Sequence, residues 1–190
     1  MAREKIADKE KAIIEAAIAV FAERGFWNTP TSLISKTAGV ADGTLFTYFA
    51  TKDDLIHAVY LAVKGELADE LMAGFDTLPT LYEKMRHIWS HFIEWGVAHP
   101  ERFRVMQQIK SNYAISPDVA AQGLEPFAAI DQIARESIAS GLVHDYPVDY
   151  LGALMDSQSS MTVEFITTHP EGIHYYIDIG FEILWKGVTR

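Results

Sequence analysis

Apolar residues recur along the chain at the three- and four-residue spacing of amphipathic helices. Glycine and proline fall almost entirely between these periodic segments, and alternating runs typical of strands are absent. The first helix is predicted over about residues 8–24, followed by Gly25 as a left-handed helix end. Its apolar face consists of Ile13, Ile14, Ala17, Val20 and Phe21. The pattern predicts an all-α protein.

Two short helices are predicted next. The first begins near Thr29, a side-chain cap, with Pro30 in the first helical position, and ends at Gly39. The second covers about residues 42–49. Helices this short are stable only when docked on their neighbours. Two of them joined by a tight glycine turn have the pattern of a helix-turn-helix, whose second helix enters the major groove of DNA.

A long helix is predicted from the capping-box variant Thr51-Lys52-Asp53-Asp54 to about residue 75. Five further helices are predicted over about residues 80–98, 100–113, 116–141, 148–168 and 171–188. We expect about nine helices in two domains. We expect residues 1–52 to form the three-helix DNA-binding domain and residues 53–190 to form a helical effector-binding and dimerisation domain. The helix that begins at residue 51 connects the two domains.

The N-terminal residues also form a dense, ordered string. In order it consists of Ala16-Ala17, Phe21-Ala22-Glu23-Arg24-Gly25-Phe26, Thr29, Ala38-Gly39-Val40, Gly43-Thr44-Leu45-Phe46, Tyr48-Phe49 and Lys52. This string, over about residues 10–60, resembles the DNA-binding domain of the TetR/AcrR family of bacterial transcriptional regulators. The remaining two thirds match that family only in length and helical character. The resemblance implies a ligand-responsive DNA-binding regulator, acting as a repressor, with a variable inducer-binding domain.

Five matched positions on and after the second short helix have a DNA-contact interpretation. Gly43 allows a backbone to approach DNA closely, and Thr44 and Thr47 offer a hydroxyl and a methyl group to base edges or phosphates. The resemblance places Tyr48 and Lys52 on the phosphate backbone. In the alternative interpretation, Tyr48 is half-buried in the core and Lys52 is only solvated.

Polar residues at the start of the first short helix are further candidates. Thr29, Thr31 and Ser32 are expected to donate to phosphate, helped by the helix dipole, although Thr29 has a simpler interpretation as a cap. Three apolar residues of the second short helix are assigned to the core instead of to DNA. They are Leu45, Phe46 and Phe49.

The chain departs from the family pattern at two places. Similar proteins usually open the recognition helix with a hydroxyl cap and a basic residue, whereas this chain has Ala41 and Asp42. Asp42 either caps the helix or accepts a hydrogen bond from a cytosine amino group, and in both cases it repels phosphates. Ser32 stands where many similar proteins carry Arg. We therefore expect modest nonspecific affinity with a steep salt dependence.

Charge is unevenly distributed along the 190 residues. The net charge is −10, but residues 1–52 carry seven Lys or Arg against six acids, which leaves −11 on residues 53–190. A near-neutral head on an acidic body suits contact with DNA at one end. The absence of cysteine excludes disulfides, thiolate zinc sites and cysteine nucleophiles. With no apolar run suited to a signal peptide or a membrane span, we expect a cytoplasmic protein without a membrane partner.

The C-terminal region is rich in large, adaptable apolar groups. The resemblance implies that a small apolar or aromatic effector binds among the middle helices and shifts the dimer away from its DNA-binding state. The predicted pocket consists of Trp89, Phe92, Trp95, Phe103, Met106, Tyr113, Phe127 and Met155, with Gln158 and Thr162 as polar groups that orient the ligand. The alternative is that these side chains simply fill a core.

The last two helices carry more apolar surface than one core needs. A four-helix interface in a homodimer would use it, and two-fold symmetry would present two recognition helices to half-sites about 34 Å apart or a multiple. The predicted interface residues are Phe165, Ile173, Tyr176, Ile177, Phe181, Leu184 and Trp185. The competing interpretation is an intramolecular core.

Catalysis has no positive support in the sequence. His87 and His91 have the four-residue spacing of a metal pair, but no third ligand accompanies them, so we expect no metal site and no cofactor. Ser157, Ser159 and Ser160 lack a glycine elbow, and no phosphate-binding glycine loop exists. A helical enzyme or ligand carrier, and a dimeric adaptor with an inert DNA head, remain the alternatives.

Overall fold

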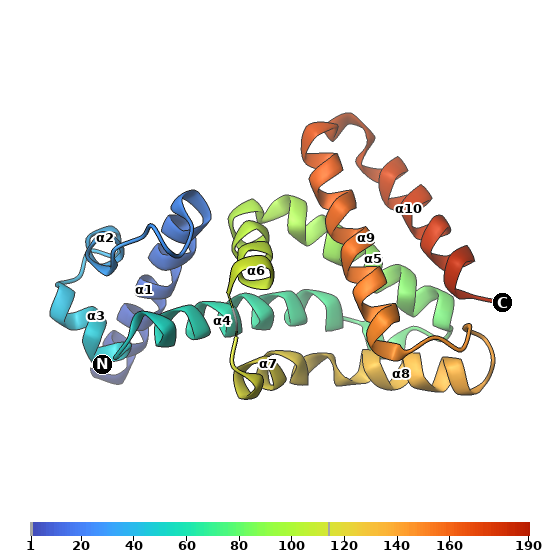
Figure 1. Cartoon of the computed structure of the whole chain (residues 1–190), viewed down its shortest axis with the longest axis horizontal. Coiled ribbons are helices and arrows are strands. Elements are labelled where there is room, and N and C mark those ends of the chain that lie inside the picture. The colour runs from blue at the N-terminus through green and yellow to red at the C-terminus, as the bar shows by residue number, and fades with distance from the viewer. Residues whose placement is uncertain (1, 114) are drawn as a thin grey trace. The chain divides into compact units, whose positions relative to one another are not determined.

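The computed structural model describes residues 2–113 and 115–190 and is helical throughout these ranges (Figure 1). The first four helices are α1 (Ala2–Arg24), α2 (Thr31–Thr37), α3 (Asp42–Tyr48) and α4 (Lys52–Met72). They are followed by α5 (Leu81–Ala98), α6 (Pro100–Asn112), α7 (Pro117–Leu124), α8 (Ala128–Ala139), α9 (Val148–Thr168) and α10 (Ile173–Val188). Short 3-10 turns occupy Phe75–Thr77, Glu125–Phe127 and Pro170–Gly172. The predicted all-α class is confirmed.

Helix boundaries differ from the sequence prediction at α1, at α2 and in the segment over residues 116–141. Pro30 is the N-cap residue of α2 and not its first helical residue, so this helix begins at Thr31. α1 begins at Ala2, one and a half turns before the predicted start near residue 8. The segment predicted as one helix over 116–141 is split into α7 and α8 by the 3-10 turn Glu125–Phe127. Pro126 stands in the first turn of that segment, where its missing N–H interrupts the α-helical hydrogen bonds.

The chain divides into two compact units. The N-terminal unit contains residues 1–65 and 100–123, and the C-terminal unit contains residues 66–99 and 124–190. The predicted boundary after residue 52 therefore falls within the N-terminal unit, because the first two thirds of α4 and the later helices α6 and α7 belong to the same unit as α1 to α3. A single boundary along the sequence separates α6 from α1, although the two helices are in contact and belong to the same unit.

The core of the N-terminal unit forms where the inward faces of α1 to α4 meet. Its fully buried apolar side chains include Ile13, Ala17, Phe21, Ile34, Leu45, Leu55 and Val59. A capping box fixes the start of α4: the Thr51 hydroxyl accepts from the Asp54 backbone N–H at 3.1 Å, and the Asp54 carboxylate accepts from the Thr51 N–H at 2.9 Å. The predicted Thr51–Asp54 cap is confirmed.

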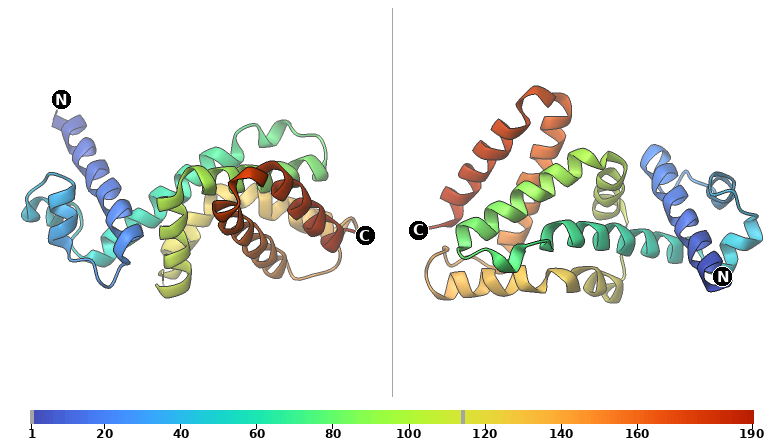
Figure 2. Two further views of the ribbon diagram at one scale, coloured as in Figure 1. Left: turned by 90° about the horizontal axis from the view of Figure 1, so that it is seen from above. Right: turned by 180° about the vertical axis from the view of Figure 1, so that it is seen from behind.

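The C-terminal unit is built on α5, α9 and α10, which contact one another pairwise. α9 and α10 run side by side in opposite directions in both views of Figure 2. Trp89 fills the junction of α5 and α10, since its indole Nε1 donates to the Ile177 carbonyl oxygen at 2.8 Å. Gly180 makes room for this ring, because a Cβ there would lie 2.6 Å from Cζ2 of Trp89. No helix of the described chain is both long and apolar enough to cross a membrane.

Candidate nucleic-acid interface

A tight glycine turn joins α2 to α3. The Val40 N–H donates to the Ser35 carbonyl oxygen at 3.0 Å and the Gly39 N–H to the Lys36 carbonyl oxygen at 3.2 Å, the pairing of a Schellman motif. Gly39 has a φ of 69°, in the left-handed region that favours glycine. This turn sets the direction in which α3 leaves α2. The predicted helix-turn-helix is present.

The two sides of α3 face different surroundings. Leu45 and Phe49 are buried, as predicted, whereas Gly43 and Thr47 are exposed. Phe46 is 47% exposed, so its assignment to the core is wrong. The reason is helical geometry: residues 45 and 49 share a face at four-residue spacing, and residue 46 points about 100° away from residue 45. Thr44 and Tyr48 are half-buried at the margins.

Asp42 is exposed at the first position of α3 and does not cap it. The N-cap residue is Ala41, which makes no side-chain cap. The capping interpretation of Asp42 is therefore wrong, and its carboxylate is available to groups outside the chain. Thr47 is exposed, but its hydroxyl donates to the Gly43 carbonyl oxygen at 2.9 Å. That hydroxyl would meet DNA as an acceptor.

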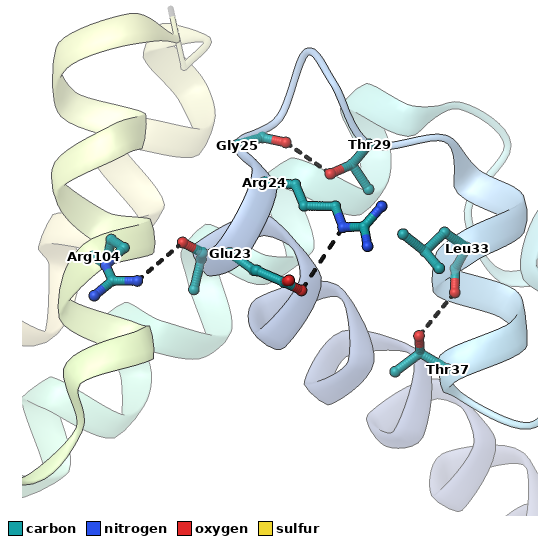
Figure 3. A network of polar contacts seen from close by, with 8 residues as sticks. Glu23, Arg24, Gly25, Thr29, Leu33, Thr37 and Arg104 are labelled. Atoms are coloured by element: carbon teal, nitrogen blue, oxygen red, sulfur yellow. Dashed lines mark hydrogen bonds and ion pairs between the residues drawn. The ribbon is translucent and has the colours of Figure 1, made fainter.

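Thr29 has an internal role instead of the predicted contact with phosphate. It is 1% exposed, and its hydroxyl donates to the Gly25 carbonyl oxygen at 2.7 Å (Figure 3). It does not cap α2 either, because the N-cap residue is Pro30. Thr29 is therefore not part of the candidate DNA surface. Of the other candidates at this helix, Thr31 is half-buried and Ser32 is exposed.

Lys52 also makes internal contacts that the sequence does not predict. Its Nζ donates to the Thr29 carbonyl oxygen at 2.6 Å and to the Phe26 carbonyl oxygen. Burial lowers the pKa of Lys52 from its ordinary value, and the nearby carboxylate of Asp53 opposes this shift. Two of the three ammonium protons thus hold the turn between α1 and α2.

Ion pairs and hydrogen bonds fasten α6 to α1. Nη2 of Arg102 lies 2.9 Å from each carboxylate oxygen of Glu15. Two residues along α6, Arg104 donates at 3.4 Å to the carbonyl oxygen of Ala22 in the last turn of α1 (Figure 3). A displacement of α6 would therefore act directly on the first helix of the DNA-binding domain.

Tyr113, predicted in the effector pocket, belongs instead to an aromatic cluster around the turn between α1 and α2. Its ring lies 6.0 Å from that of Phe26 and 6.1 Å from those of Trp27 and His57. Burial and a hydrogen bond to the Asp53 carboxylate raise the pKa of Tyr113 to about 12. Trp27 is 74% exposed, and no pattern in the sequence distinguishes it as a member of this cluster.

The other predicted pocket residues are divided between the two units. Phe103 and Met106 belong with Tyr113 to the N-terminal unit, and the remaining seven belong to the C-terminal unit. The polar groups expected to orient a ligand are already bonded internally: the Gln158 amide donates to the Gly180 carbonyl oxygen at 3.0 Å, and the Thr162 hydroxyl donates to the Gln158 carbonyl oxygen at 2.8 Å. The Gln158 bond joins α9 to α10, whereas the Thr162 bond lies within α9.

His87 and His91 lie next to each other on one side of α5, with ring centroids 3.8 Å apart and ring planes tilted by 32°. His87 Nε2 lies 3.1 Å from the Leu71 carbonyl oxygen. Burial and the neighbouring His91 lower the pKa of His87 below its ordinary value, while the contact with Leu71 and the charge of Glu70 oppose the shift. Among residues 7–111, 113 and 115–190, no group of three or more His, Asp or Glu side chains could hold a metal ion.

Three predicted dimer residues are core residues of the C-terminal unit. Ile177, Phe181 and Leu184 are buried within the chain, so the intramolecular interpretation is the right one for them. The large apolar side chains that α9 and α10 expose lie half a turn away. Those on the second half of α9 and on α10 we call the α9–α10 patch, and they are Met161, Phe165, Tyr175, Ile179 and Ile183. Tyr150 is also exposed, but it lies in the first turn of α9 and is not included. On α10 they recur every four residues, which is one continuous face.

Comparison with known proteins identifies the chain. A family model described as bacterial regulatory proteins, tetR family, matches residues 13–59, from α1 into α4. The crystal structure of a TetR-family transcription regulator from Shewanella sp. PV-4 covers 96% of this chain and 98% of its own, with a TM-score of 0.88 and 27% identity. The chain belongs to the TetR family of bacterial regulatory proteins. This TetR-family protein therefore carries the DNA-binding domain of a bacterial transcription regulator.

Two other relatives of this TetR-family protein are informative. The fatty acid metabolism regulator protein of Bacillus subtilis (strain 168) is 35% identical over 85 residues, which are 44% of each chain. The chain thus spans about half the length of the first curated relatives it matches. The crystal structure of FadR from Bacillus subtilis in complex with stearoyl-CoA covers 94% of this chain and 99% of its own, with a TM-score of 0.76 and 23% identity. That identity supports a common fold alone.

Proposed function

We propose that the chain is a homodimeric repressor that binds a palindromic operator through α3 and releases it when a small, largely apolar effector binds. The observation that carries this proposal is the two-sided character of α3. Leu45 and Phe49 anchor one side in the core, and the other side presents Gly43, Phe46 and Thr47 to solvent. In helix-turn-helix proteins this free side of the second helix meets base edges in the major groove.

Three side chains of α3 are proposed to bind DNA by hydrogen bonding. Thr44 meets a base edge or phosphate from the margin of the exposed side, and Tyr48 donates its phenol to a phosphate. Asp42, exposed and acting only as an acceptor, binds a cytosine amino group. At the start of α2, the Thr31 and Ser32 hydroxyls donate to phosphates. Gly43 has no heavy atom within 4 Å of an added Cβ, which suits a close approach of the groove wall.

The dimer is proposed to form over the α9–α10 patch. Ile183 is 65% exposed and Met161 54% exposed, and large apolar groups gathered on adjacent helices favour association in water. A two-fold axis would cover both copies of the patch and present two α3 helices to half-sites about 34 Å apart or a multiple. From the predicted interface, Phe165 remains in this proposal because it is exposed.

The effector is proposed to be largely apolar and to bind within the C-terminal unit. The support is the apolar and aromatic content of that unit, where Phe127 and Met155 are half-buried and Phe92 and Trp95 are buried. A long-chain acyl-CoA is the first compound to test, because a solved relative holds stearoyl-CoA. Binding to a DNA-incompetent dimer would shift the population away from the operator-binding state.

The experiment is fluorescence anisotropy with a labelled duplex from the DNA flanking the chain's own coding region, repeated over a series of salt concentrations. We expect tight binding that weakens steeply with salt, because phosphate contacts release counterions. Tyr48→Ala should reduce affinity about 10-fold or more, the equivalent of one charge-assisted hydrogen bond. Stearoyl-CoA should then lower the anisotropy of the wild-type complex.

The matched control is Tyr150→Ala, which removes an exposed tyrosine from the C-terminal unit and should leave DNA affinity unchanged. Because the operator can lie elsewhere in the genome, selection from a pool of random duplexes accompanies the flanking DNA. A chain that prefers no sequence over a random duplex, with and without the acyl-CoA, would overturn the proposal.

A further inference from the structure

Phe46 is an apolar side chain on the side of α3 that is turned away from the core. It is 47% exposed, although its neighbours Leu45 and Phe49 are at most 5% exposed. Within the part of the chain that the structure describes, no aromatic ring pairs with that of Phe46. Leaving half of a phenylalanine in water forfeits the free energy that its burial would supply. About half of this side chain thus gains no burial in the folded chain.

The neighbours of Phe46 on that side leave it accessible. Gly43, three residues earlier, has no side chain and open space where a Cβ would stand. Asp42 and Thr47 are exposed beside it, and the Thr47 hydroxyl is turned back to the Gly43 carbonyl oxygen. The ring of Phe46 is thus the largest group that α3 presents on this side, and it carries no hydrogen-bond donor or acceptor.

Phosphates and most base edges offer a phenyl ring nothing favourable, because they present hydrogen-bonding atoms. The exception in the major groove is the C5-methyl group of thymine, which apolar side chains contact. We propose that Phe46 contacts the methyl group of one thymine in each half-site and is a specificity-determining residue for the operator. This inference rests on the proposed function, since it requires α3 to bind in the major groove.

The test removes the methyl group from DNA. An operator is first selected by the wild-type chain from random duplexes, and each thymine is then replaced by uracil, one symmetric pair of positions at a time. Uracil keeps the base pair and loses only the C5-methyl group. We expect one pair of positions at which affinity falls about fourfold for each half-site, or about fifteenfold for both, from the lost burial of one methyl group each.

Phe46→Ala completes a double-mutant cycle. This variant should bind the thymine operator more weakly than wild type and should bind the thymine and uracil duplexes equally well at the sensitive positions. Thr47→Ala is the comparison on the same side of α3: its overall affinity is free to fall, since Thr47 is itself a candidate DNA contact, but its ratio of thymine to uracil affinity at the sensitive positions should stay that of wild type. Thermal unfolding of both variants checks that they fold, and Phe46→Leu, which keeps an apolar group, supplies a second variant that should retain part of the sensitivity.

The outcomes separate this inference from the proposed function. A chain that selects an operator but binds every uracil duplex as tightly as the thymine duplex overturns the role of Phe46 alone. The same conclusion follows if Phe46→Ala keeps the full sensitivity to uracil, or if the selected half-sites contain no thymine. A chain that selects no sequence at all overturns the proposed function and this inference together.

Discussion

The ammonium of Lys52, at the first residue of α4, donates a 2.6 Å hydrogen bond to the carbonyl oxygen of Thr29, at the end of the turn between α1 and α2. A second bond to the Phe26 carbonyl oxygen ties the ammonium to the other side of the same turn. One side chain therefore joins the helix that leaves the DNA-binding domain to the turn that positions α2. The hydrogen bonds of Lys52 in this structure are therefore structural, since both are made to backbone groups of the same chain.

We expect Lys52→Met, which keeps an apolar stem and removes the ammonium, to lower the free energy of unfolding by about 1–3 kcal/mol, because two carbonyl groups lose a charged donor. The slope of log affinity against log salt should stay the same as in wild type. Urea unfolding and anisotropy measure the two quantities. A slope smaller by about 1.8, which is about 0.9 for each of the two half-sites, would show instead that phosphates hold this ammonium in the complex.

The α9–α10 patch predicts the behaviour of a charge placed on it. Ile183→Arg should convert the dimer to a monomer, because the guanidinium would have to be desolvated at the centre of a two-fold contact. Leu142→Arg is the matched control, since Leu142 is 58% exposed but lies outside α9 and α10. Light scattering after size exclusion gives the mass of each. Two variants of equal mass would contradict an interface at this patch.

Gly180 and Gly187 lie on the same helix, α10, and predict opposite responses to alanine. A Cβ at Gly180 would lie 2.6 Å from the Trp89 ring, so Gly180→Ala should destabilise the chain by about 1–3 kcal/mol through overpacking. A Cβ at Gly187 meets nothing within 4 Å. Gly187→Ala should therefore be neutral or stabilising by up to about 1 kcal/mol. Thermal unfolding measures the stability of both variants. A similar loss of stability in the two variants would be inconsistent with this packing.

The contact between His87 and His91 predicts a stability that falls in mild acid. The pKa of His87 lies below its ordinary value, so the folded state binds fewer protons than the unfolded state below about pH 6.5. Stability from this site is present above that pH and decreases as the pH falls. His91→Gln removes the neighbouring charge and should raise the pKa of His87, observed by NMR titration. An unchanged titration of His87 would leave burial as the only cause.

Much of the fold could be predicted because amphipathic periodicity, glycine stops and caps act over a few residues. The Schellman turn at Gly39 and the capping box at Thr51 are of this kind. Local patterns do not predict the buried side of a helix that carries apolar residues on all of its sides. On α10, apolar residues occur on both the buried and the exposed side, so the period alone does not say which side Phe181 or Ile183 occupies.

Residues that act across the fold could not be assigned from spacing. Tyr113 reaches the turn between α1 and α2 only because α6 belongs to the N-terminal unit. In the same way, the contact between Arg102 and Glu15 joins residues that are 87 positions apart in the sequence. The bond from Lys52 to the Thr29 carbonyl oxygen is invisible in the sequence for a different reason. Any residue in position 29 would supply a backbone acceptor, so no side-chain pattern records the contact.

The contact of α6 with α1 bears on any attempt to join the DNA-binding domain of this protein to the C-terminal domain of another protein. A graft cut after residue 52 or 65 would leave behind Arg102, the partner of Glu15, and Arg104, the donor to Ala22. The transferred domain would then lack α6, the helix that holds α1 in place. A working hybrid should take residues 100–123 together with residues 1–65, as two separate pieces of one module.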